Sequence, residues 1–311
     1  MTIHKPVFLK ETLELLKIKK GYVVVDATLG GGGHGQAILN KIGEHGKYIA
    51  FDLDLEAIER FKFKTQSAKF KINENFFLIN DNFANIVKNL ENLKIEKVDA
   101  IVADLGWSSD QLTGKGMSFL TDEELDMRYD NNQELTAKKI INEYPKEELI
   151  RILRDYGEEK FAKRIVQEVI GYRERKIIEK TSELAELIKM TVPKRFQGRI
   201  HPATRTFQAL RIETNKELEN LEKFIPQAVE SLVSQGRLAI ITFHSLEDRI
   251  VKNSFRENAG GCVCPKDFPQ CVCGKKAKVR IITKKPIAPG GEEVFLNPRS
   301  RSAKLRVVEK I

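Results

Sequence analysis

The chain has 311 residues, 31% charged and 41% hydrophobic, with a net charge of +9 and a sequence pI of about 9.2. A chain of this length can bury a substantial core and hold one large domain or two smaller ones. No apolar run approaches the roughly 20 residues that cross a bilayer. The first residues, MTIHKPVFLKE, carry lysines and a glutamate where a signal peptide is apolar. The sequence therefore predicts a soluble cytoplasmic protein with no membrane partner.

The positive charge is concentrated in two segments. Residues 160–211 hold 13 Lys and Arg against 5 Asp and Glu, and residues 275–310 hold 11 against 3. Each segment has a balance of +8, so the rest of the chain sums to −7. Two basic segments on an acidic remainder favour a polyanionic partner. A solvated lysine-rich surface is the alternative.

The first strong pattern is YVVVDATLGGGGHG at 22–35. The valines at 23–25 predict a strand buried on both faces, which Asp26 closes. The glycines at 30–33 allow a sharp turn and a close approach of the backbone to a ligand, and a helix is expected at 34–42. A strand, a glycine-rich turn and a helix N-terminus together form a site of nucleotide size.

Strands alternate with helices through the first hundred residues. Apolar periodicity predicts an amphipathic stretch at 9–16, further strands at 48–51, 76–79 and 98–103, and helices at 55–63 and 83–90. The strands end at polar residues, namely Asp26, Asp52, Asn80-Asp81-Asn82 and Asp104. This alternation predicts a parallel sheet with helices on both faces.

The alternation breaks from Gly106 to about Phe207, where helical patterns replace strands. One is an apolar stripe from Phe161 to Tyr172, and another begins with Thr181-Ser182 as an expected N-cap. We therefore expect an inserted helical domain whose basic half, 160–211, contacts the polyanion. The predicted division is a domain made of 1–110 and 208–311, with the insertion at 111–207.

The sheet is expected to resume after the insertion. The predicted elements are a helix at 218–232 and strands at 237–243, 279–283 and 305–308. The last two strands leave no room for an ordinary crossover helix. The sheet is therefore predicted to end in an antiparallel pair.

The glycine turn matches a dinucleotide fingerprint, Gly30-x-Gly32-x-x-Gly35, and Asp52 lies about 20 residues on, where an acid would hold ribose hydroxyls. A structural turn is the alternative, and the ligand could be a dinucleotide or S-adenosylmethionine. Asp26 before the glycines and the antiparallel end of the sheet favour S-adenosylmethionine.

Three other residues are candidates for the same edge of the sheet. Asp104 ends the fourth strand beside the first, where such sheets bind ligands, and could accept a hydrogen bond from an amino group. A turn or N-cap aspartate is the alternative. Trp107 could stack on a base or belong to the core. His244 could contact substrate or bond to its neighbouring loop.

Four cysteines form two pairs, Cys262-x-Cys264 and Cys271-x-Cys273. Four thiolates within 12 residues could bind a structural zinc, although the one-residue gaps are tighter than usual. Unligated thiols are the alternative, and a disulfide is less expected in a reducing cytosol. No metal site is assigned from these patterns.

From end to end, these motifs resemble the bacterial MraW (RsmH) family. The resemblance rests on a series of unusual strings in order: HxPV at 4–7, DATLGGGGH at 26–34, DLGWSSDQL at 104–112, LDMRYD at 125–130, YGEEKFAKRI at 156–165, HPATRTFQALRI at 201–212, FHSLEDRIVK at 243–252 and NPRSRSAKLRV at 297–307. The tetracysteine segment is not general to the family. Gly35 stands where the family often has serine, and Trp107 where a smaller apolar residue is common.

The resemblance implies a class I, Rossmann-like methyltransferase that uses S-adenosylmethionine to methylate N4 of one cytidine in 16S ribosomal RNA of the small subunit. No protein partner is implied. The residues implied to contact the methyl donor are Gly32, Gly33, His34, Asp52, Phe83, Asp104 and Gln111.

The implied reaction is direct displacement, in which the enzyme mainly aligns the amine, the methyl carbon and the sulfur. Asp104 or a nearby backbone carbonyl is the expected acceptor for the amine protons, and His244 is a further catalytic candidate. The target cytidine must leave its stack. A nicotinamide-dependent dehydrogenase and a non-catalytic RNA-binding assembly factor are the competing interpretations.

Overall fold

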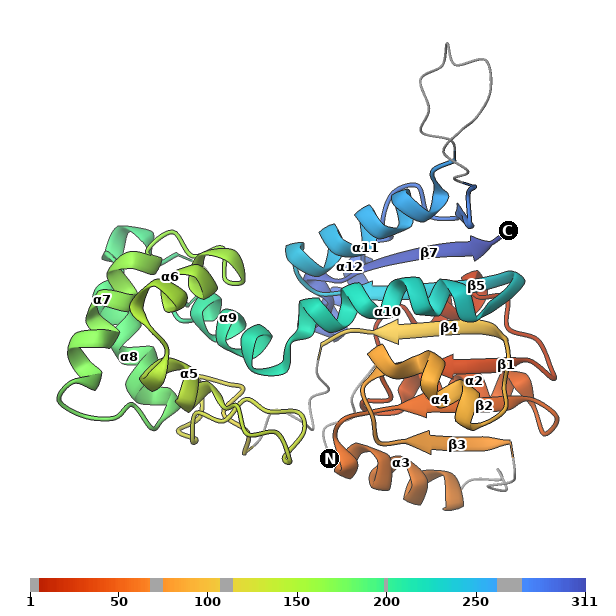
Figure 1. Cartoon of the computed structure of the whole chain (residues 1–311), viewed down its shortest axis with the longest axis horizontal. Helices are drawn as coiled ribbons and strands as arrows, with labels where there is room; N and C mark the ends of the chain where they lie inside the picture. The colour runs from red at the N-terminus through yellow and green to blue at the C-terminus, as the bar shows by residue number, and fades with distance from the viewer. Residues whose placement is uncertain (1–5, 68–74, 107–113, 199–200, 262–275) are drawn as a thin grey trace, which may run out of the picture. The chain divides into compact units, whose positions relative to one another are not determined.

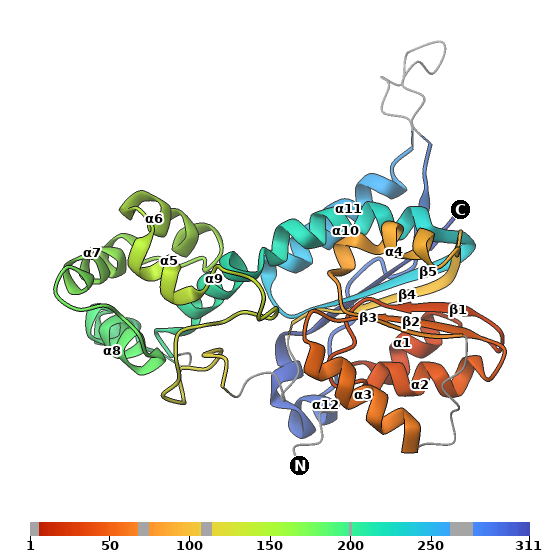
Figure 2. The same ribbon diagram turned by 60° about the horizontal axis from the view of Figure 1, so that its bottom comes forward.

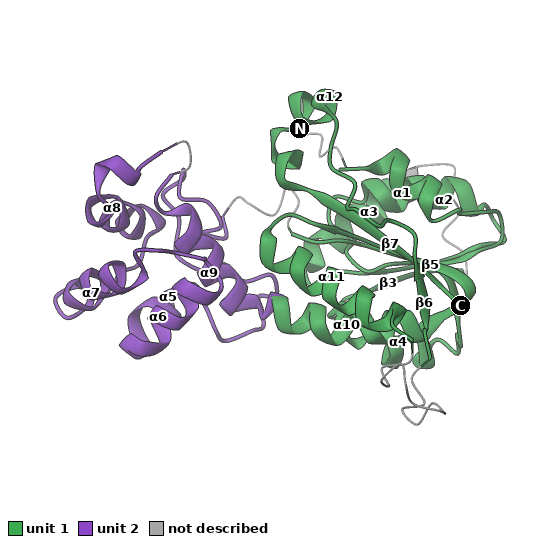
Figure 3. Cartoon of the chain, turned by 90° about the horizontal axis from the view of Figure 1, so that it is seen from above, with its two compact units in different colours: residues 1–106, 218–311 green, residues 107–217 purple. Residues whose placement is uncertain are grey.

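The computed structural model describes residues 6–67, 75–106, 114–198, 201–261 and 276–311. The chain forms two compact units, which Figure 3 distinguishes by colour. One comprises Met1–Gly106 and Leu218–Ile311, and the other Trp107–Glu217. No helix in the described ranges is both long and apolar enough to span a bilayer.

The first unit contains a seven-stranded sheet of order β3-β2-β1-β4-β5-β7-β6 (Figure 1). Its strands are β1 Val23–Asp26, β2 Lys47–Phe51, β3 Phe76–Ile79, β4 Val98–Asp104, β5 Leu232–Thr242, β6 Val279–Ile281 and β7 Lys304–Lys310. β1 to β5 are parallel, whereas β7 is antiparallel to both β5 and β6. The predicted parallel sheet with an antiparallel end is confirmed.

Helices cover both faces of this sheet (Figure 2). One face carries α1 Leu9–Leu15, α2 Gly33–Ile42 and α3 Leu55–Ser67, and the other carries α4 Ile86–Asn92, α10 Glu217–Ser231 and α11 Ser245–Ala259. The central strands contribute buried side chains to a separate apolar core on each face. Burial on both faces explains why their sequences are continuous apolar runs.

One predicted strand begins earlier than expected, and one predicted helix starts at the expected residue but opens with a 3-10 turn. β5 starts at Leu232 rather than Arg237, because its pairing with β4 shifts register between Val98 and Ala100. The helix expected at 83–90 begins as a 3-10 turn, η1 Phe83–Asn85, whose N-cap Asn82 accepts a hydrogen bond from the Ala84 N–H. Polar residues and an irregular register hid the start of β5 from apolar periodicity.

The second unit is helical. It contains α5 Ala137–Glu143, α6 Lys146–Asp155, α7 Ala162–Arg173, α8 Thr181–Thr191, η3 Lys194–Phe196 and α9 Thr204–Asn215. Its own apolar core includes Ile140, Ile152, Ile165 and Leu210, all fully buried. The one extended pairing in its described part is an isolated bridge between Glu124 and Lys180.

The N-cap expected at Thr181-Ser182 is wrong by one or two residues. Lys180 is the N-cap of α8, and Glu183 accepts hydrogen bonds from the N–H groups of Glu179 and Lys180. The Thr181 hydroxyl instead donates to the Thr121 carbonyl oxygen. A glutamate that reaches back over the helix start therefore replaces the hydroxyl cap.

The second junction between the units falls after Glu217, whereas the sequence placed it after 207. Phe207, Ala209 and Leu210 on α9 are buried in the core of the helical unit. Most of α9 therefore lies beyond the predicted boundary but packs with the helical unit.

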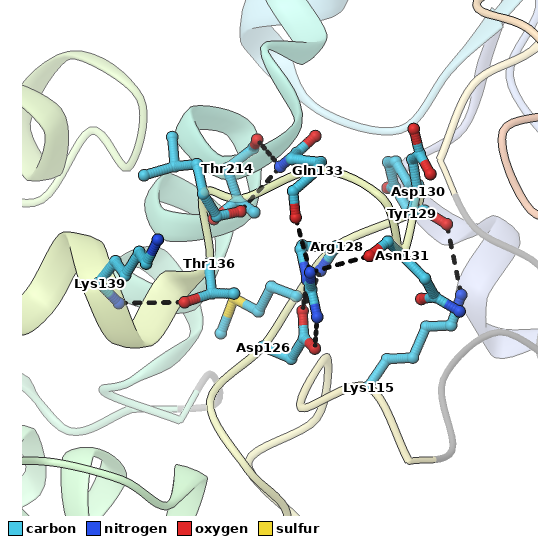
Figure 4. A network of polar contacts seen from close by, with 12 residues as sticks. Lys115, Asp126, Arg128, Tyr129, Asp130, Asn131, Gln133, Thr136, Lys139 and Thr214 are labelled. Carbon is cyan, nitrogen blue, oxygen red and sulfur yellow. Dashed lines mark hydrogen bonds and ion pairs between the residues drawn. The ribbon is translucent and has the colours of Figure 1, made fainter.

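A loop of the helical unit is fixed by Arg128, which lies at the centre of Figure 4. Its guanidinium donates to both carboxylate oxygens of Asp126, with Nε–Oδ1 2.7 Å and Nη2–Oδ2 2.8 Å. Its Nη1 also donates to the backbone oxygens of Asn131 (3.0 Å) and Gln133 (2.6 Å). Gln133 in turn donates to the Thr214 carbonyl oxygen of α9. These contacts tie the conspicuous LDMRYD string to α9.

Candidate functional site

The site is built at the edge where the parallel strands end. Asp26 is the last residue of β1, Asp52 follows β2, and Asp104 is the last residue of β4 (Figure 1). Because these strands are adjacent and parallel, their carboxyl ends lie side by side. The structure thus gathers three aspartates that the sequence had singled out.

The glycine turn joins β1 to α2. Gly30 and Gly32 have φ angles of 50° and 75°, and a Cβ at Gly32 would overlap the Phe61 ring. The Gly30 N–H donates to Asp52 Oδ2 at 2.7 Å. Glycine is therefore required at Gly32 by both backbone conformation and space, and the turn is held against the end of β2.

The N-terminus of α2 is packed from two sides. A Cβ at Gly33 would lie 2.8 Å from the Pro6 Cγ, and one at Gly35 would overlap the Tyr48 hydroxyl. The hydroxyl explains why this chain has glycine at position 35. Close packing leaves the first N–H groups of α2 at the end of the glycine turn, an arrangement that suits an anionic or polar ligand group.

Asp26 is buried and bonded. Its Oδ2 accepts from the Tyr48 hydroxyl at 2.8 Å, and its Oδ1 accepts from the Thr28 N–H at 3.3 Å. Burial raises the pKa of Asp26 to about 7, despite these two hydrogen bonds, which lower it. Burial also raises the pKa of Tyr48 well above its usual value, so the phenol remains a donor.

Asp52 organises two turns at once. Its Oδ2 accepts from the Gly30 N–H and its Oδ1 from the Asp54 N–H, at 2.7 Å and 2.8 Å. Burial raises the pKa of Asp52 to about 6, and the hydrogen bonds from Asp54 and Gly30 oppose this rise. The carboxylate keeps further acceptor capacity for a ligand.

Asp104 lies beside His34, with 3.5 Å between Asp104 Oδ2 and His34 Nδ1. The Asp104 N–H donates to Thr28 Oγ1 at 2.6 Å, while Asp104 Oδ1 is buried and has no hydrogen-bond partner among the described residues. Burial, followed by the charges of Asp26 and Glu247, raises the pKa of Asp104 well above its usual value. This buried, unsatisfied carboxyl oxygen makes Asp104 a candidate for a hydrogen bond to a ligand at this edge.

His244 is the N-cap of α11. Its Nδ1 accepts from the Glu247 N–H at 3.4 Å, and its Nε2 lies 3.1 Å from Glu247 Oε1. Glu247 Oε2 accepts from the N–H groups of Phe243 and His244. The structure therefore gives His244 bonds to its own helix start, one of the two alternatives drawn from the sequence.

Of the remaining candidates, Phe83 lies within the described residues and the others do not. Phe83 begins η1 after β3 and packs edge-on against Phe224, with ring centroids 5.0 Å apart. Trp107, Gln111 and the four cysteines lie outside the described residues. The sequence reasoning missed Tyr48 and Glu247. Tyr48 has no local signal inside an apolar strand, but the spacing from His244 to Glu247 is that of a capping box.

Chemically, the site combines four carboxyl groups, from Asp26, Asp52, Asp104 and Glu247, with a glycine turn and a helix start. Burial, together with repulsion from neighbouring carboxylates, raises the pKa values of Asp26, Asp52 and Asp104. A cationic ligand would be favoured because it relieves the repulsion. The site suits a nucleoside that carries positive charge.

The sheet order, the antiparallel β7 and an acid after β2 define a Rossmann-like methyltransferase of class I. All 311 residues match the MraW methylase family, and the chain belongs to this family of S-adenosylmethionine-dependent methyltransferases. The family assignment excludes the nicotinamide-dependent dehydrogenase that the glycine fingerprint alone had left open.

The chain is similar to several proteins named ribosomal RNA small subunit methyltransferase H. It is 50% identical over 310 residues to that of Clostridium botulinum (strain Kyoto / Type A2), covering 99% of each chain. It is 48% identical to that of Lachnospira eligens, covering 99% of this chain and 98% of the relative, and 49% identical to that of Halothermothrix orenii, covering 100% and 99%.

Solved structures show more distant likeness. An rRNA methylase from Streptococcus thermophilus has 13% identity and a TM-score of 0.43, with 100% of this chain and 99% of that chain covered. TrmN from Thermus thermophilus has 12% identity and a TM-score of 0.43, with 97% and 48% covered.

Proposed function

We propose that the protein transfers a methyl group from S-adenosylmethionine to the exocyclic N4 amine of a cytidine in 16S ribosomal RNA of the small subunit. The observation that carries this proposal is identity of about 50% along the whole chain to proteins named for small-subunit ribosomal RNA methylation. The choice of N4 of cytidine rests on the motif resemblance across the same length.

The residues at the strand ends fit the methyl donor. Asp104 has a buried carboxyl oxygen with no partner among the described residues, and Asp52 keeps acceptor capacity beside the glycine turn. We assign donor contacts to Gly32, Gly33, His34, Asp52, Phe83 and Asp104, and to Gln111, which lies outside the described residues. When bound, the donor supplies an electrophilic methyl carbon on a sulfonium.

Methyl transfer exchanges one S–C bond for one N–C bond, and the amine loses a proton to an acceptor. The cytidine N4 lone pair forms the N–C bond, the S–C bond electrons return to sulfur, and the amine releases one proton. The protein must align these atoms and accept or relay that proton. Asp104 is our candidate acceptor, and a backbone carbonyl nearby is the alternative.

Asp104 can accept a proton only when it is ionised. Burial and the charges of Asp26 and Glu247 disfavour that state in the protein alone. A cation bound beside Asp104 would lower its pKa. His34, 3.5 Å away, would position the carboxyl group. His244 remains a weaker candidate, because its ring nitrogens lie against Glu247.

Exposed basic residues support an RNA substrate. In the first unit, η4 Pro298–Ser302 carries exposed Arg299 and Arg301, and Lys284 and Lys285 are also exposed. In the helical unit, the predicted polyanion contact at 160–211 carries further exposed cations. We assign substrate recognition to the helical unit and additional phosphate contacts to the segment near η4, with affinity that falls as salt rises.

One experiment tests the proposal. Small ribosomal subunits lacking the modification are incubated with the protein and methyl-labelled S-adenosylmethionine, and the 16S RNA is digested to nucleosides. The expected labelled product is N4-methylcytidine. Another labelled nucleoside would refute the assignment of N4, and RNA binding without label would support the non-catalytic assembly factor.

A further inference from the structure

Two aromatic rings and a guanidinium meet where η3 approaches the start of α7. The ring centroids of Phe161 and Phe196 are 5.1 Å apart, and the guanidinium carbon of Arg195 lies 5.0 Å from the Phe196 centroid. Phe161 packs against the core of the helical unit, whereas Phe196 is 56% exposed. Phe196 is therefore an exposed ring that packs on Phe161, which in turn packs on the core of the helical unit.

The turn that carries Phe196 is held in place. Gln197 Nε2 donates to the carbonyl oxygens of Lys189 and Val192, at 2.8 Å and 2.7 Å, and the Phe196 N–H donates to Pro193. These bonds fix η3 to the end of α8. An exposed ring on a fixed backbone loses little entropy when something stacks on it.

Further cations flank Phe161 and Phe196 in the sequence. Lys160, Lys163, Arg164 and Lys194 are exposed, and none forms an ion pair with a described residue. The first turn of α7 contains no acid. Glu159, which precedes Lys160 in the sequence, is buried and accepts from the Phe161 N–H.

This arrangement opposes the ordinary preference of a helix. The N-terminus of α7 has a positive dipole end, where acids stabilise and cations destabilise. Lys163 and Arg164 both lie in that first turn. A bound anion would relieve the repulsion, so the charge pattern itself points to a polyanionic occupant.

We propose that the α7–η3 surface, defined as Lys160, Phe161, Lys163, Arg164, Lys194, Arg195 and Phe196, binds a single-stranded segment of the RNA substrate. An unpaired base stacks on Phe196, and phosphates contact the surrounding cations. A duplex hides its base faces and can use only the cations. The assignment of the RNA rests on the proposed function, but the binding chemistry requires only unpaired nucleotides.

The test uses the full chain and fluorescence anisotropy with a labelled 12-nucleotide single strand and the same strand in a duplex. Phe196→Ala is expected to weaken single-strand binding on the order of tenfold and to leave duplex binding unchanged. The double variant Lys163→Glu/Arg164→Glu should weaken both and reduce the salt dependence. It should also raise Tm, because acids suit the first turn of α7.

Two matched controls separate this surface from general effects. Leu120→Ala removes another exposed apolar side chain of the helical unit, and Leu120 is 85% exposed. Lys139→Glu reverses an exposed cation in the first turn of α5. Both should leave single-strand affinity within twofold of the native protein.

If Phe196→Ala bound the single strand with native affinity, the stacking site would be overturned, whether or not the variant had a lower Tm. If only Lys163→Glu/Arg164→Glu weakened binding, and did so equally for the single strand and the duplex, the surface would make phosphate contacts alone. That result would also overturn the stacking site. Loss of single-strand binding in Phe196→Ala, with no methylation of 16S RNA by the native protein, would support this surface while refuting the proposed function.

Discussion

The Tyr48 hydroxyl donates to Asp26 Oδ2 at 2.8 Å and occupies the space that a Cβ on Gly35 would need. One buried hydroxyl thus satisfies the carboxyl group at the end of β1 and fixes the residue type in the first turn of α2. The Tyr48 side chain on β2 therefore contacts both β1, through Asp26, and α2, at Gly35.

We expect Gly35→Ala and Tyr48→Phe to be coupled. Gly35→Ala should lower the free energy of unfolding by about 1–3 kcal/mol through overpacking, and Tyr48→Phe by about 1–3 kcal/mol because Asp26 loses its donor. The double variant should lose less than the sum, since removing the hydroxyl frees space for the new methyl group. Urea unfolding of the four proteins measures the cycle, and strict additivity would contradict the coupling.

Asp26→Asn should flatten the dependence of stability on pH. The folded pKa of about 7 lies above the unfolded value of about 3.9. Folded Asp26 therefore binds more protons between these values, and the free energy of unfolding falls as pH rises through this window. The contribution is on the order of 4 kcal/mol across the window, at about 1.4 kcal/mol per pKa unit.

Unfolding in urea at pH 5 and pH 8, without ligand, checks this effect. The native protein should lose more stability between the two values than Asp26→Asn does. Asp52, with a folded pKa of about 6, should contribute in the same direction. An unchanged slope in Asp26→Asn would mean that Asp26 is ionised throughout.

Asp104 should make donor binding depend on pH. Because the folded pKa of Asp104 is raised, binding a cation releases its proton, and affinity for S-adenosylmethionine should rise with pH by at most about tenfold per unit. S-adenosylhomocysteine lacks the sulfonium charge and should show a weaker dependence. Calorimetry in two buffers of different ionisation enthalpy counts the released proton.

Asp104→Asn should abolish that proton release, and Asp104→Ala should lose nearly all methyl transfer. Turnover is measured with saturating donor, so that weaker binding is separated from the loss of an acceptor. Near-native turnover of Asp104→Ala under these conditions would rule out Asp104 as the proton acceptor.

Arg128→Lys should destabilise the helical unit by about 1–2 kcal/mol. Lysine cannot reproduce the two-pronged contact with Asp126 or the bonds to the carbonyl oxygens of Asn131 and Gln133. Amide hydrogen exchange should accelerate in the 126–133 loop and α9. Arg154→Lys is the control, because Arg154 is 66% exposed and pairs with its neighbour Asp155. Equal effects in both variants would contradict the structural role of Arg128.

Apolar runs predicted the sheet well, because β1, β2 and β4 are buried on both faces and leave a continuous signal. The aspartates at the strand ends were expected to lie together, because parallel strands bring their carboxyl ends to one edge of the sheet. Tyr48 could not be found, since its role depends on a hydroxyl that reaches across to Asp26. The extent of α9 was also missed, because its pattern does not reveal which core it joins.

The sequence pattern indicated which residues lie at the site, but it could not indicate their pKa values. Asp26 and Asp104 were singled out by position, yet burial is the main cause of their raised pKa values. The charge of Asp52 adds to the rise at Asp26, and the charges of Asp26 and Glu247 add to it at Asp104. Such effects arise only when distant segments fold together. His244 illustrates the reverse case, because a local cap to Glu247 was readable from their spacing.

The insertion of a whole unit between neighbouring strands affects synthesis of the protein. β4 pairs with β5, which lies roughly 130 residues further along the chain, so a ribosome adding about 5–20 residues per second leaves the β4 edge open for roughly 5–30 s. An apolar strand with a free edge invites aggregation. All residues of the helical unit emerge before β5, so that unit can complete its own core while the nascent sheet still awaits its next strand.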